Sequence, residues 1–251
     1  MLTKNRIRLI RSLETRRHRI EEGLFVAEGP KLVGELLAAM SPRYVAALPQ
    51  WIEANAALLP ATAEVDAIGQ EELQRISFLR APQQVLALFD LPRWTWDAAS
   101  AREELCLALD GVQDPGNLGT ICRVADWFGI QDILCSHETA DIFNPKAVQA
   151  TMGALARVRL HYVDLPQTLA AAGVPVFGTF LDGKSIYGQT LSSNGIIVMG
   201  NEGNGISPAV EQHVTQRLLI PNFPAGRQTT ESLNVAIATS IVCAEFRRRQ
   251  A

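Results

Sequence analysis

The feature that most constrains the fold is a regular alternation of short apolar runs with helical segments over the second half of the chain. The apolar runs lie at residues 105–109, 130–134, 158–163, 174–179, 196–199 and 218–220. Helices are predicted between or after them at residues 118–128, 146–155, 167–172, 208–214 and 233–249. Strands that are apolar almost throughout and alternate with helices are typical of a parallel sheet covered on both faces. We therefore predict an α/β fold, whose ligands bind in loops beyond the carboxyl ends of the strands.

A smaller α/β unit precedes this series. Its strands are predicted at residues 24–28, 44–48, 63–68 and 84–89, with helices at 31–40, 51–58 and 70–76. The stretch after Leu91 contains Pro92 and two tryptophans and loses the periodicity on both sides. We therefore expect an N-terminal domain over residues 1–92, a linker over 93–104 and a larger domain over 105–251.

Basic residues are concentrated at the start of the chain. The whole chain has 23 Lys and Arg against 26 Asp and Glu, a net charge of −3, so it has no general positive field that would favour nucleic acid. Residues 4–19 nevertheless contain one acidic residue, Glu14, against Lys4, Arg6, Arg8, Arg11, Arg16, Arg17 and Arg19. Two interpretations stay open: the solvated face of a helix that buries Ile7, Leu9 or Ile10 and Leu13, or a local surface for nucleic acid.

Several other classes of protein lack a signature in this sequence. Four cysteines stand far apart among apolar neighbours, so we expect buried thiols rather than metal ligands. The four histidines are scattered, and we predict no metal site. There is no G-x-S-x-G motif, which argues against an α/β-hydrolase. No apolar run follows the basic start, and the apolar stretch at 233–246 is too short to cross a bilayer, so we expect a cytoplasmic protein.

Three loops that follow predicted strands share an unusual composition. The first, residues 110–120, contains three glycines and Asn117, and it leads into a helix that carries Arg123. Glycines permit close backbone approach, the amide of Asn117 donates and accepts, and the Arg123 guanidinium can bind a phosphate through two donors. A strand-to-helix turn with an ordinary cap would explain the same residues.

The second loop, residues 199–207, has the glycine order G-x-x-G-x-G and one carboxylate, Glu202. This order differs from the dinucleotide-binding fingerprint, and the loop lacks the lysine of a P-loop. The third loop begins at Ile220 and ends at the start of the last predicted helix. Ser232 is a good N-cap there, whereas Asn234 lies among apolar residues and would need a hydrogen-bond partner if buried.

In this order and spacing, the three loops resemble the three signature motifs of the SpoU/TrmH family of RNA ribose methyltransferases, within the SPOUT superfamily. The matched segments are residues 114–119 with Arg123, residues 200–203 with Gly205, and residues 220–221 with residues 231–235. Residues 8–13 and 25–29 also resemble the small substrate-binding domain of many members. Two positions depart from the common pattern, Thr151 in place of Ser and Asn222 in place of Met.

The resemblance implies a homodimer that transfers a methyl group from S-adenosylmethionine to a ribose 2′-hydroxyl in structured RNA. It also implies a ribosomal-protein-like N-terminal α/β domain, and a trefoil knot in the carboxyl-terminal domain. The catalytic residues that it implies are Asn117, Arg123, Glu202, Ser232 and Asn234. The implied cofactor-binding residues are Thr179, Phe180, Leu181, Gly200, Ile220 and Leu233. The implied RNA-binding residues are Lys4, Arg8, Arg11, Arg16, Arg17 and Arg19.

Within this scheme Arg123 is a poor proton acceptor, because a guanidinium has a pKa above about 12. We expect it to bind a phosphate and stabilise the alkoxide, while Asn117, Ser232 and Asn234 orient the ribose and Glu202 holds Asn117 or Arg123 in place. No metal is required. Ribosomal RNA is the expected substrate and tRNA the closest alternative. A catalytically silent RNA-binding or ribosome-assembly factor and a small-molecule methyltransferase are the other hypotheses.

Overall fold

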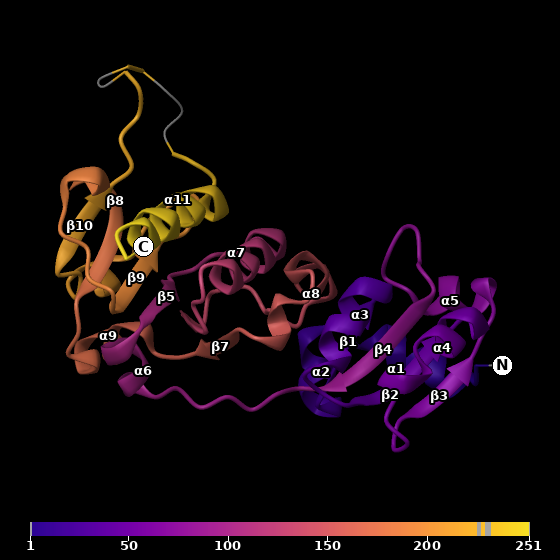
Figure 1. Cartoon of the computed structure of the whole chain (residues 1–251). Helices are drawn as coiled ribbons and strands as arrows, with labels where there is room; N and C mark the ends of the chain where they lie inside the picture. Colours follow the sequence, from indigo (N-terminus) through magenta and orange to yellow (C-terminus); the bar gives the residue numbers. More distant parts are fainter. Residues whose placement is uncertain (1, 225–226, 229–231, 251) are drawn as a thin grey trace. The chain divides into compact units, whose positions relative to one another are not determined.

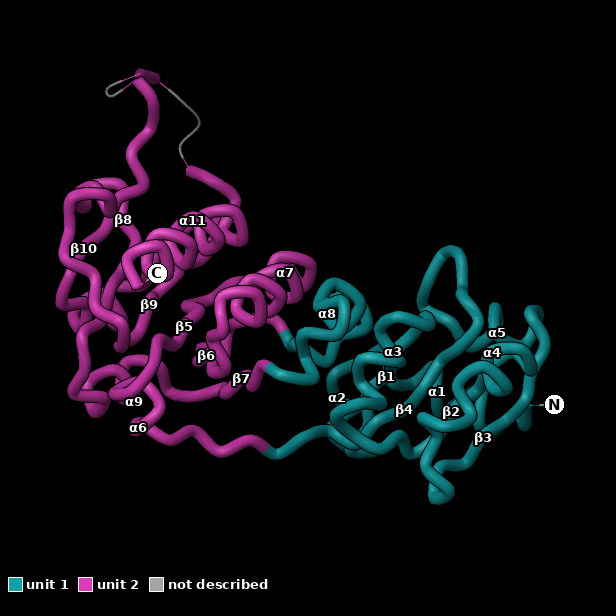
Figure 2. Tube along the Cα trace, in the orientation of Figure 1, with its two compact units in different colours: residues 1–93, 141–157 teal, residues 94–140, 158–251 magenta. Residues whose placement is uncertain are grey.

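The computed structural model describes residues 2–224, 227–228 and 232–250. The chain forms two compact units, each built around its own sheet. Unit 1 comprises residues 1–93 and 141–157, and unit 2 comprises residues 94–140 and 158–251 (Figure 2). The chain therefore passes between the units three times, after residues 93, 140 and 157.

Unit 1 contains a four-stranded mixed sheet in the order β1-β4-β2-β3. β4 is antiparallel to both β1 and β2, and β2 is parallel to β3. In chain order (Figure 1) the elements are α1 (Lys4–Ser12), α2 (Arg16–Glu22), β1 (Leu24–Glu28), α3 (Pro30–Leu37), β2 (Pro42–Ala47), α4 (Pro49–Ala54), η1 (Ala56–Leu58), β3 (Glu64–Ala67), α5 (Gln70–Ile76), β4 (Val85–Asp90), α8 (Pro145–Thr151) and η2 (Ala154–Ala156).

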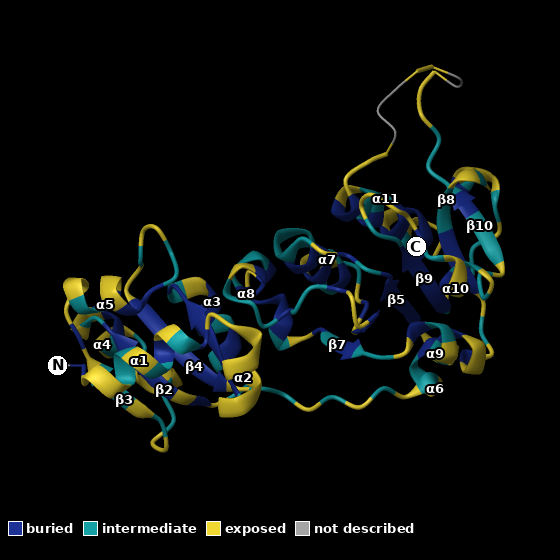
Figure 3. Cartoon of the chain, turned by 180° about the vertical axis from the view of Figure 1, so that it is seen from behind, coloured by how far each residue is buried: buried dark blue, intermediate teal, exposed yellow. Residues whose placement is uncertain are grey.

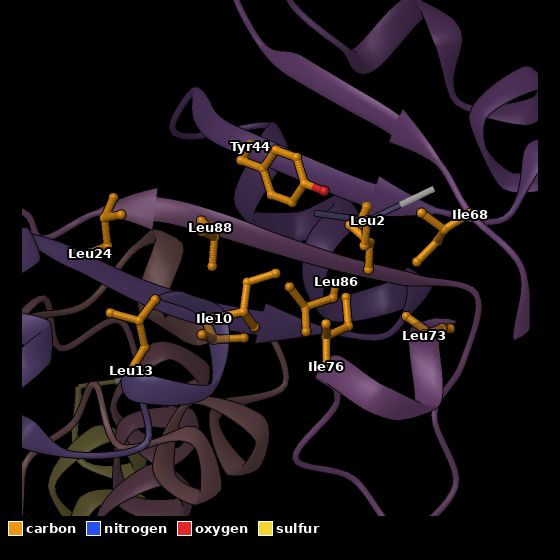
Figure 4. Close-up of a cluster of buried hydrophobic side chains, with 12 residues drawn as sticks. Leu2, Ile10, Leu13, Leu24, Tyr44, Ile68, Leu73, Ile76, Leu86 and Leu88 are labelled. Atoms are coloured by element: carbon orange, nitrogen blue, oxygen red, sulfur yellow. The ribbon is translucent and has the colours of Figure 1, made fainter. Parts of the chain in front are cut away.

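The apolar stripe predicted for the basic segment is confirmed. Ile10 and Leu13 are fully buried, and Ile7 packs against the same cluster. Figure 4 shows Ile10 and Leu13 in this cluster, together with Leu86 and Leu88 of β4 and with Leu73 and Ile76 of α5. The segment is two helices rather than one, because the Thr15 hydroxyl accepts a hydrogen bond from the His18 amide and starts a new helix.

Residues 141–157 pack with the N-terminal residues, which differs from the expected contiguous domain over 105–251. Asp141 pairs with the buried Arg19 at 2.6 Å. The rings of Phe143 and Phe25 lie 5.0 Å apart. These contacts join chain segments more than a hundred residues apart, so local sequence carries no sign of them.

Unit 2 is built on a six-stranded sheet in the order β10-β8-β9-β5-β6-β7. Every neighbouring pair is parallel, which confirms the predicted α/β fold with a parallel sheet. The trefoil knot stays a prediction. The elements are α6 (Ala98–Glu103), β5 (Leu105–Leu109), α7 (Pro115–Trp127), β6 (Asp132–Cys135), β7 (Arg159–Tyr162), α9 (Leu165–Ala172), β8 (Val176–Ser185), η3 (Ile186–Gly188), β9 (Gly195–Met199), α10 (Pro208–Glu211), β10 (Gln216–Leu219) and α11 (Val235–Arg248).

Helices cover both faces of this sheet, and the central strands are buried (Figure 3). On one face, α6, α9 and α10 enclose a core that includes Cys106, Leu134 and Val198 of the strands. On the other face α7 packs against α11, and Phe246 of α11 meets Phe177 of β8 edge-on at 4.9 Å between ring centroids.

Three elements differ from the prediction. The predicted linker contains α6, which the Asp97 carboxylate caps by accepting a hydrogen bond from the Ala99 amide at 2.9 Å. β8 runs on to Ser185 instead of ending near residue 179, because its last residues pair with β10 after a register shift. The cap of α11 is Asn234, so the prediction of Ser232 as the N-cap was wrong.

All four cysteines are buried and free, as predicted. Burial raises the pKa of Cys106 and of Cys243 to about 12, which keeps these thiols protonated. Among the described residues, no helix combines the length and the apolar character that crossing a membrane requires.

Candidate active site

The first motif forms the turn between β5 and α7. The Asp114 carboxylate accepts a hydrogen bond from the Asn117 amide at 2.8 Å and caps α7, with Pro115 at the first helical position. Gly111 has a φ of +72°, which a side chain would disfavour. This local geometry fixes Asn117 in the first turn of the helix, with its side chain half-buried at the carboxyl edge of the sheet.

The second motif is a tight turn after β9, closed by two backbone hydrogen bonds between Asn201 and Gly205. The Asn201 side chain accepts from the amides of Gly203 and Asn204, and it donates to the Gly111 carbonyl oxygen at 2.7 Å. It thereby ties the second motif to the first. Sequence reasoning missed Asn201; its place beside Glu202 and the preference of Asn for turns were the available signals.

Gly200 must be glycine in this turn. A Cβ added there would lie 2.3 Å from the backbone carbon of Gly205 and 2.4 Å from the backbone nitrogen of Ile206. Distances that short are impossible for real Cβ atoms, so a larger residue would force the turn apart. The side of Gly200 on which a Cβ would stand is therefore filled by the backbone of Gly205 and Ile206, and glycine is required here by the close packing of the turn.

The three motifs meet in one chain of hydrogen bonds. The Asn117 side-chain amide donates to Glu202 Oε1 at 2.9 Å. Asn234 Nδ2 donates to Asn117 Oδ1 at 3.0 Å, while Asn234 Oδ1 accepts from the Ala236 and Ile237 amides at the start of α11. Each of the two side-chain amides donates through its nitrogen to one neighbour and accepts through its oxygen from another. All hydrogen bonds of the Glu202–Asn117–Asn234 network therefore run in one direction, from Asn234 to Asn117 to Glu202.

These three hydrogen-bonded side chains are accessible to solvent: Glu202 and Asn234 are exposed and Asn117 is half-buried. The Gln113 backbone amide approaches the second oxygen of Glu202, Oε2, at 3.4 Å. One carboxylate and two oriented amides are thus presented at the edge of the sheet. Such groups can hold and orient a polar substrate, for example one with hydroxyls.

The other two predicted catalytic residues, Arg123 and Ser232, are not part of the hydrogen bonds that join Glu202, Asn117 and Asn234. Arg123 is exposed on α7, six residues after Asn117, so a helix of 3.6 residues per turn directs the two side chains to different sides. None of the ion pairs among the described residues involves Arg123. Ser232 is exposed two residues before Asn234, and the neighbouring Glu231 of the third motif falls outside the described residues.

The predicted cofactor residues lie on or after three neighbouring strands. Gly200 follows β9, Ile220 follows β10 and is half-buried, and Leu233 precedes α11 with 49% of its surface exposed. The Thr179 hydroxyl lies 3.5 Å from the Val198 carbonyl oxygen of β9. Since β10, β8 and β9 are adjacent and parallel, their carboxyl ends share one edge of the sheet.

Phe180 and Leu181 belong to β8 itself, and not to a loop after it as predicted. The Arg217 guanidinium lies over the Phe180 ring at 3.6 Å and also pairs with Asp182. Leu181 is 75% exposed. One face of the Phe180 ring is therefore covered by the Arg217 guanidinium.

The basic N-terminal residues fall into two groups. Lys4, Arg8, Arg11, Arg16 and Arg17 are exposed on α1 and α2. Arg11 also donates to the Ser77 carbonyl oxygen at 2.7 Å, and Arg17 pairs with Glu21. Arg19 is different, because only 2% of it is exposed and its guanidinium is held by Asp141 and two backbone carbonyls. The expectation of Arg19 as an RNA contact is corrected accordingly.

Other positions noted in the sequence have structural partners. The buried Thr151 hydroxyl donates to the Val148 carbonyl oxygen, and the Asn222 side chain donates to the Arg227 carbonyl oxygen. At the carboxyl end of α11, Arg247 donates to the Phe128 carbonyl oxygen, and Arg248 and Arg249 both bind the Glu245 carboxylate.

Comparison with known proteins gives the same result for both parts of the chain. The profile of the SpoU rRNA Methylase family matches residues 104–244, and that of the MRM3-like substrate binding domain matches residues 4–87. A 23S rRNA (guanosine(2553)-2′-O)-methyltransferase of Bacillus subtilis is 30% identical over 94% of this chain and 94% of its own length.

Solved structures agree. A protein from Porphyromonas gingivalis assigned to the TrmH family of RNA methyltransferases has a TM-score of 0.90 and 45% identity, and covers 99% of both chains. An AdoMet-bound rRNA methyltransferase from Sinorhizobium meliloti has a TM-score of 0.85 and 31% identity, and covers 100% of this chain and 97% of its own. These matches confirm the resemblance seen in the three motifs: the chain belongs to the SpoU rRNA methylase family and is an RNA methyltransferase.

Proposed function

We propose that this chain transfers the methyl group of S-adenosylmethionine to a ribose 2′-hydroxyl of ribosomal RNA. The observation that carries the proposal is the Glu202–Asn117–Asn234 hydrogen-bond chain, which joins the three motifs at the carboxyl edge of the parallel sheet. The relatives support the substrate and the methyl donor. The B. subtilis relative is a ribose 2′-O-methyltransferase of 23S rRNA by name, and the S. meliloti relative binds AdoMet.

The residues of the edge formed by β8, β9 and β10 fit such a methyl donor. The main-chain groups of the tight turn at Gly200 and the half-exposed apolar side chain of Leu233 suit a ligand with polar edges and an apolar part. When bound, the donor supplies a methyl group that its sulfonium has already activated. We assign Gly200, Ile220, Leu233 and Thr179 to its binding, and leave Phe180 and Leu181 as weaker candidates.

The protein must then align the ribose hydroxyl and favour loss of its proton. Asn117 and Asn234 orient the ribose, and Glu202 keeps the Asn117 amide in place. Ser232, close by in the chain, contacts the same nucleotide. Arg123 binds a phosphate of the RNA, because an exposed guanidinium has donors in a fork that matches a phosphate. The role in stabilising the alkoxide, expected from the sequence, is not kept in this proposal, because Arg123 and Asn117 point to different sides of α7.

The exposed cations of α1 and α2 form the proposed RNA surface, which we call the basic surface: Lys4, Arg8, Arg11, Arg16 and Arg17. We leave Arg19 out of it because its guanidinium is buried against Asp141. Contacts of this kind with phosphates position the RNA and weaken as the salt concentration rises. Replacing Lys4 and Arg8 with Ala should therefore weaken RNA binding and flatten its salt dependence, whereas a small-molecule methyltransferase would be unaffected.

We also propose a homodimer in the cytoplasm. Trp127 at the end of α7 is 83% exposed, and Ile237 on α11 is 54% exposed. These two helices pack against each other, and each carries an exposed apolar side chain that a second copy of the protein would cover. A monomeric mass in light scattering at micromolar concentration would refute the dimer.

The test uses total RNA from a strain that lacks this protein, with labelled S-adenosylmethionine and purified enzyme. We expect label in ribosomal RNA, in dinucleotides that resist alkali because their 2′-oxygen is methylated. Glu202→Gln should reduce the rate about tenfold or more. Glu103→Gln, at an exposed position of α6, serves as the matched control and should retain the rate.

Three outcomes would contradict the proposal. Label confined to tRNA would show that tRNA, and not ribosomal RNA, is the substrate. Label in alkali-sensitive nucleotides would exclude methylation of the ribose. Failure to bind S-adenosylmethionine in a calorimetric titration would favour the silent RNA-binding factor.

A further inference from the structure

A second concave site lies in unit 2, beside the proposed reaction site. It is a pocket of about 540 Å³, within the usual range for small-ligand sites. The loops that follow β5, β6, β7 and β9 supply its lining. Its position at the carboxyl ends of parallel strands is where ligands bind in folds of this kind. The proposed donor site uses the ends of β8, β9 and β10, so the two sites are neighbours on one edge and share the loop after β9.

The pocket is lined by a buried carboxylate, Asp110, that can accept a further hydrogen bond. Asp110 is only 8% exposed, and its Oδ2 accepts a hydrogen bond from the Ser207 amide at 2.7 Å. Among the described residues, no donor is bonded to its other oxygen, Oδ1. Because Asp110 is buried as a residue and lines the cavity, its second carboxylate oxygen is placed to accept a hydrogen bond from a ligand in the pocket. Ser136 beside it is already engaged by the Gly111 amide.

The lining selects against phosphate. It includes the carboxylates of Asp110, Glu138 and Asp164 but neither Lys nor Arg, so an anion would be repelled. Within the described residues, no acidic, histidine or cysteine cluster could hold a metal ion. Part of the wall is apolar, because Val163, Leu165, Pro166 and Val210 contribute to the lining. These features suit a neutral group that presents hydrogen-bond donors to acceptors and packs part of its surface against apolar side chains.

The pocket shares its wall with the reaction site. Gln113 lines the pocket, and its backbone amide approaches Glu202. Asn201 also lines the pocket, directly precedes Glu202 and holds the Gly111 carbonyl. An RNA strand whose ribose reaches Glu202 and Asn117 therefore has a base within reach of the pocket.

Among RNA bases, guanine matches this lining best. Its Watson–Crick edge carries two adjacent donors, N1–H and the N2 amino group. Adenine and cytosine place a ring nitrogen acceptor next to their amino group, and uracil has one donor between two acceptors, so each would turn an acceptor toward a carboxylate. We propose that this pocket binds an unstacked guanine base of the RNA, with Asp110 and Glu138 as acceptors, and thereby sets the sequence preference of methylation.

This inference rests on the proposed function, because the same RNA presents the base and the methylated ribose. It is tested by titrating guanosine, inosine and uridine into the full-length protein with S-adenosylhomocysteine present in excess, so that the donor site is filled. We expect guanosine to bind with a Kd near 1 mM and inosine, which lacks the N2 amino group, about fivefold more weakly. Uridine should bind no better than inosine.

Ala209→Trp places a large side chain at the exposed rim of the pocket and should weaken guanosine binding about tenfold. Ala171→Trp, at an exposed position of α9 outside the pocket, is the matched control and should bind guanosine as the wild type does. Asp110→Asn keeps an oxygen for the Ser207 amide but removes the charge, and should abolish the preference for guanosine over inosine.

Equal affinity for guanosine and inosine, or guanosine binding unaffected by Ala209→Trp, would overturn the inference. RNA methylation measured with the same preparations separates this failure from failure of the proposed function. Ala209→Trp that methylates the same nucleotide at the wild-type kcat/KM would refute the pocket and leave the function standing. If the protein distinguishes guanosine from inosine but methylates no RNA, the proposed function is refuted and the guanine pocket stands.

Discussion

The ion pair between Arg19 and Asp141 gives a quantitative test of how unit 1 is held together. The two side chains are 3% and 15% exposed. Removing one partner of a buried pair costs about 3–5 kcal/mol, because the remaining charge is left without compensation. In Asp141→Asn the Arg19 guanidinium keeps its hydrogen bonds to the Leu13 and Glu14 carbonyls, so we expect a loss near the lower limit, about 3 kcal/mol.

Urea unfolding measures this loss. With a slope of about 3 kcal/mol per molar, suited to a chain of this length, the midpoint should fall by about 1 M. Far-ultraviolet circular dichroism and tryptophan fluorescence should be followed together, because coincident transitions are needed for a two-state treatment. Glu21→Gln is the matched control: it makes the same chemical change in the exposed Arg17–Glu21 pair of unit 1, and should cost about 0.5 kcal/mol or less. Equal losses in the two variants would refute the assignment of Arg19 to a structural role.

Three further predictions concern the reaction site and the last helix. Asn234→Asp can still cap α11 but cannot donate to Asn117 Oδ1, so methylation should fall about tenfold or more while the thermal midpoint moves by only about 2 °C; a wild-type rate would exclude Asn234 from the site. Gly200→Ala should weaken S-adenosylmethionine binding about tenfold or more in calorimetry, because its Cβ would displace the Gly205 backbone, and unchanged affinity would contradict this. Hydrogen bonds from Arg248, assisted by Arg249, lower the pKa of Glu245 to about 2, so the stability that this carboxylate contributes is present above its ordinary pKa of 4.5 and lost as the pH falls toward 2. The difference in urea midpoint between the wild type and Glu245→Gln should therefore be largest near pH 7 and vanish near pH 2, and a difference independent of pH would refute it.

Local sequence was sufficient where an element depends on its own residues. The apolar run at 105–109 became β5 with the same limits, and the predicted helix at 70–76 became α5. Local sequence was insufficient where the extent of an element depends on a partner that is distant in the chain. The end of β8 contains Asp182 and Gly183, which resemble a turn, yet Lys184 and Ser185 pair with β10 more than thirty residues later.

The site followed the same rule. The three motifs identified Asn117, Glu202 and Asn234, but the hydrogen bond between Asn117 and Glu202 joins positions 85 residues apart and leaves no local trace. Arg19 was assigned to the RNA surface because in the sequence it cannot be distinguished from its exposed basic neighbours. Its partner Asp141 is 122 residues away, and only packing reveals that this guanidinium is structural.

The three passages of the chain between the units limit how this protein can be taken apart or recombined. Grafting residues 1–93 from a relative would leave residues 141–157, whose partners include Arg19, Phe25 and Glu35, facing a foreign surface. Conversely, deleting the N-terminal residues would strip apolar side chains such as Phe143 of their cover. We therefore expect that a functional exchange of unit 1 requires two grafts made together, residues 1–93 and residues 141–157, the second of which lies between β6 and β7.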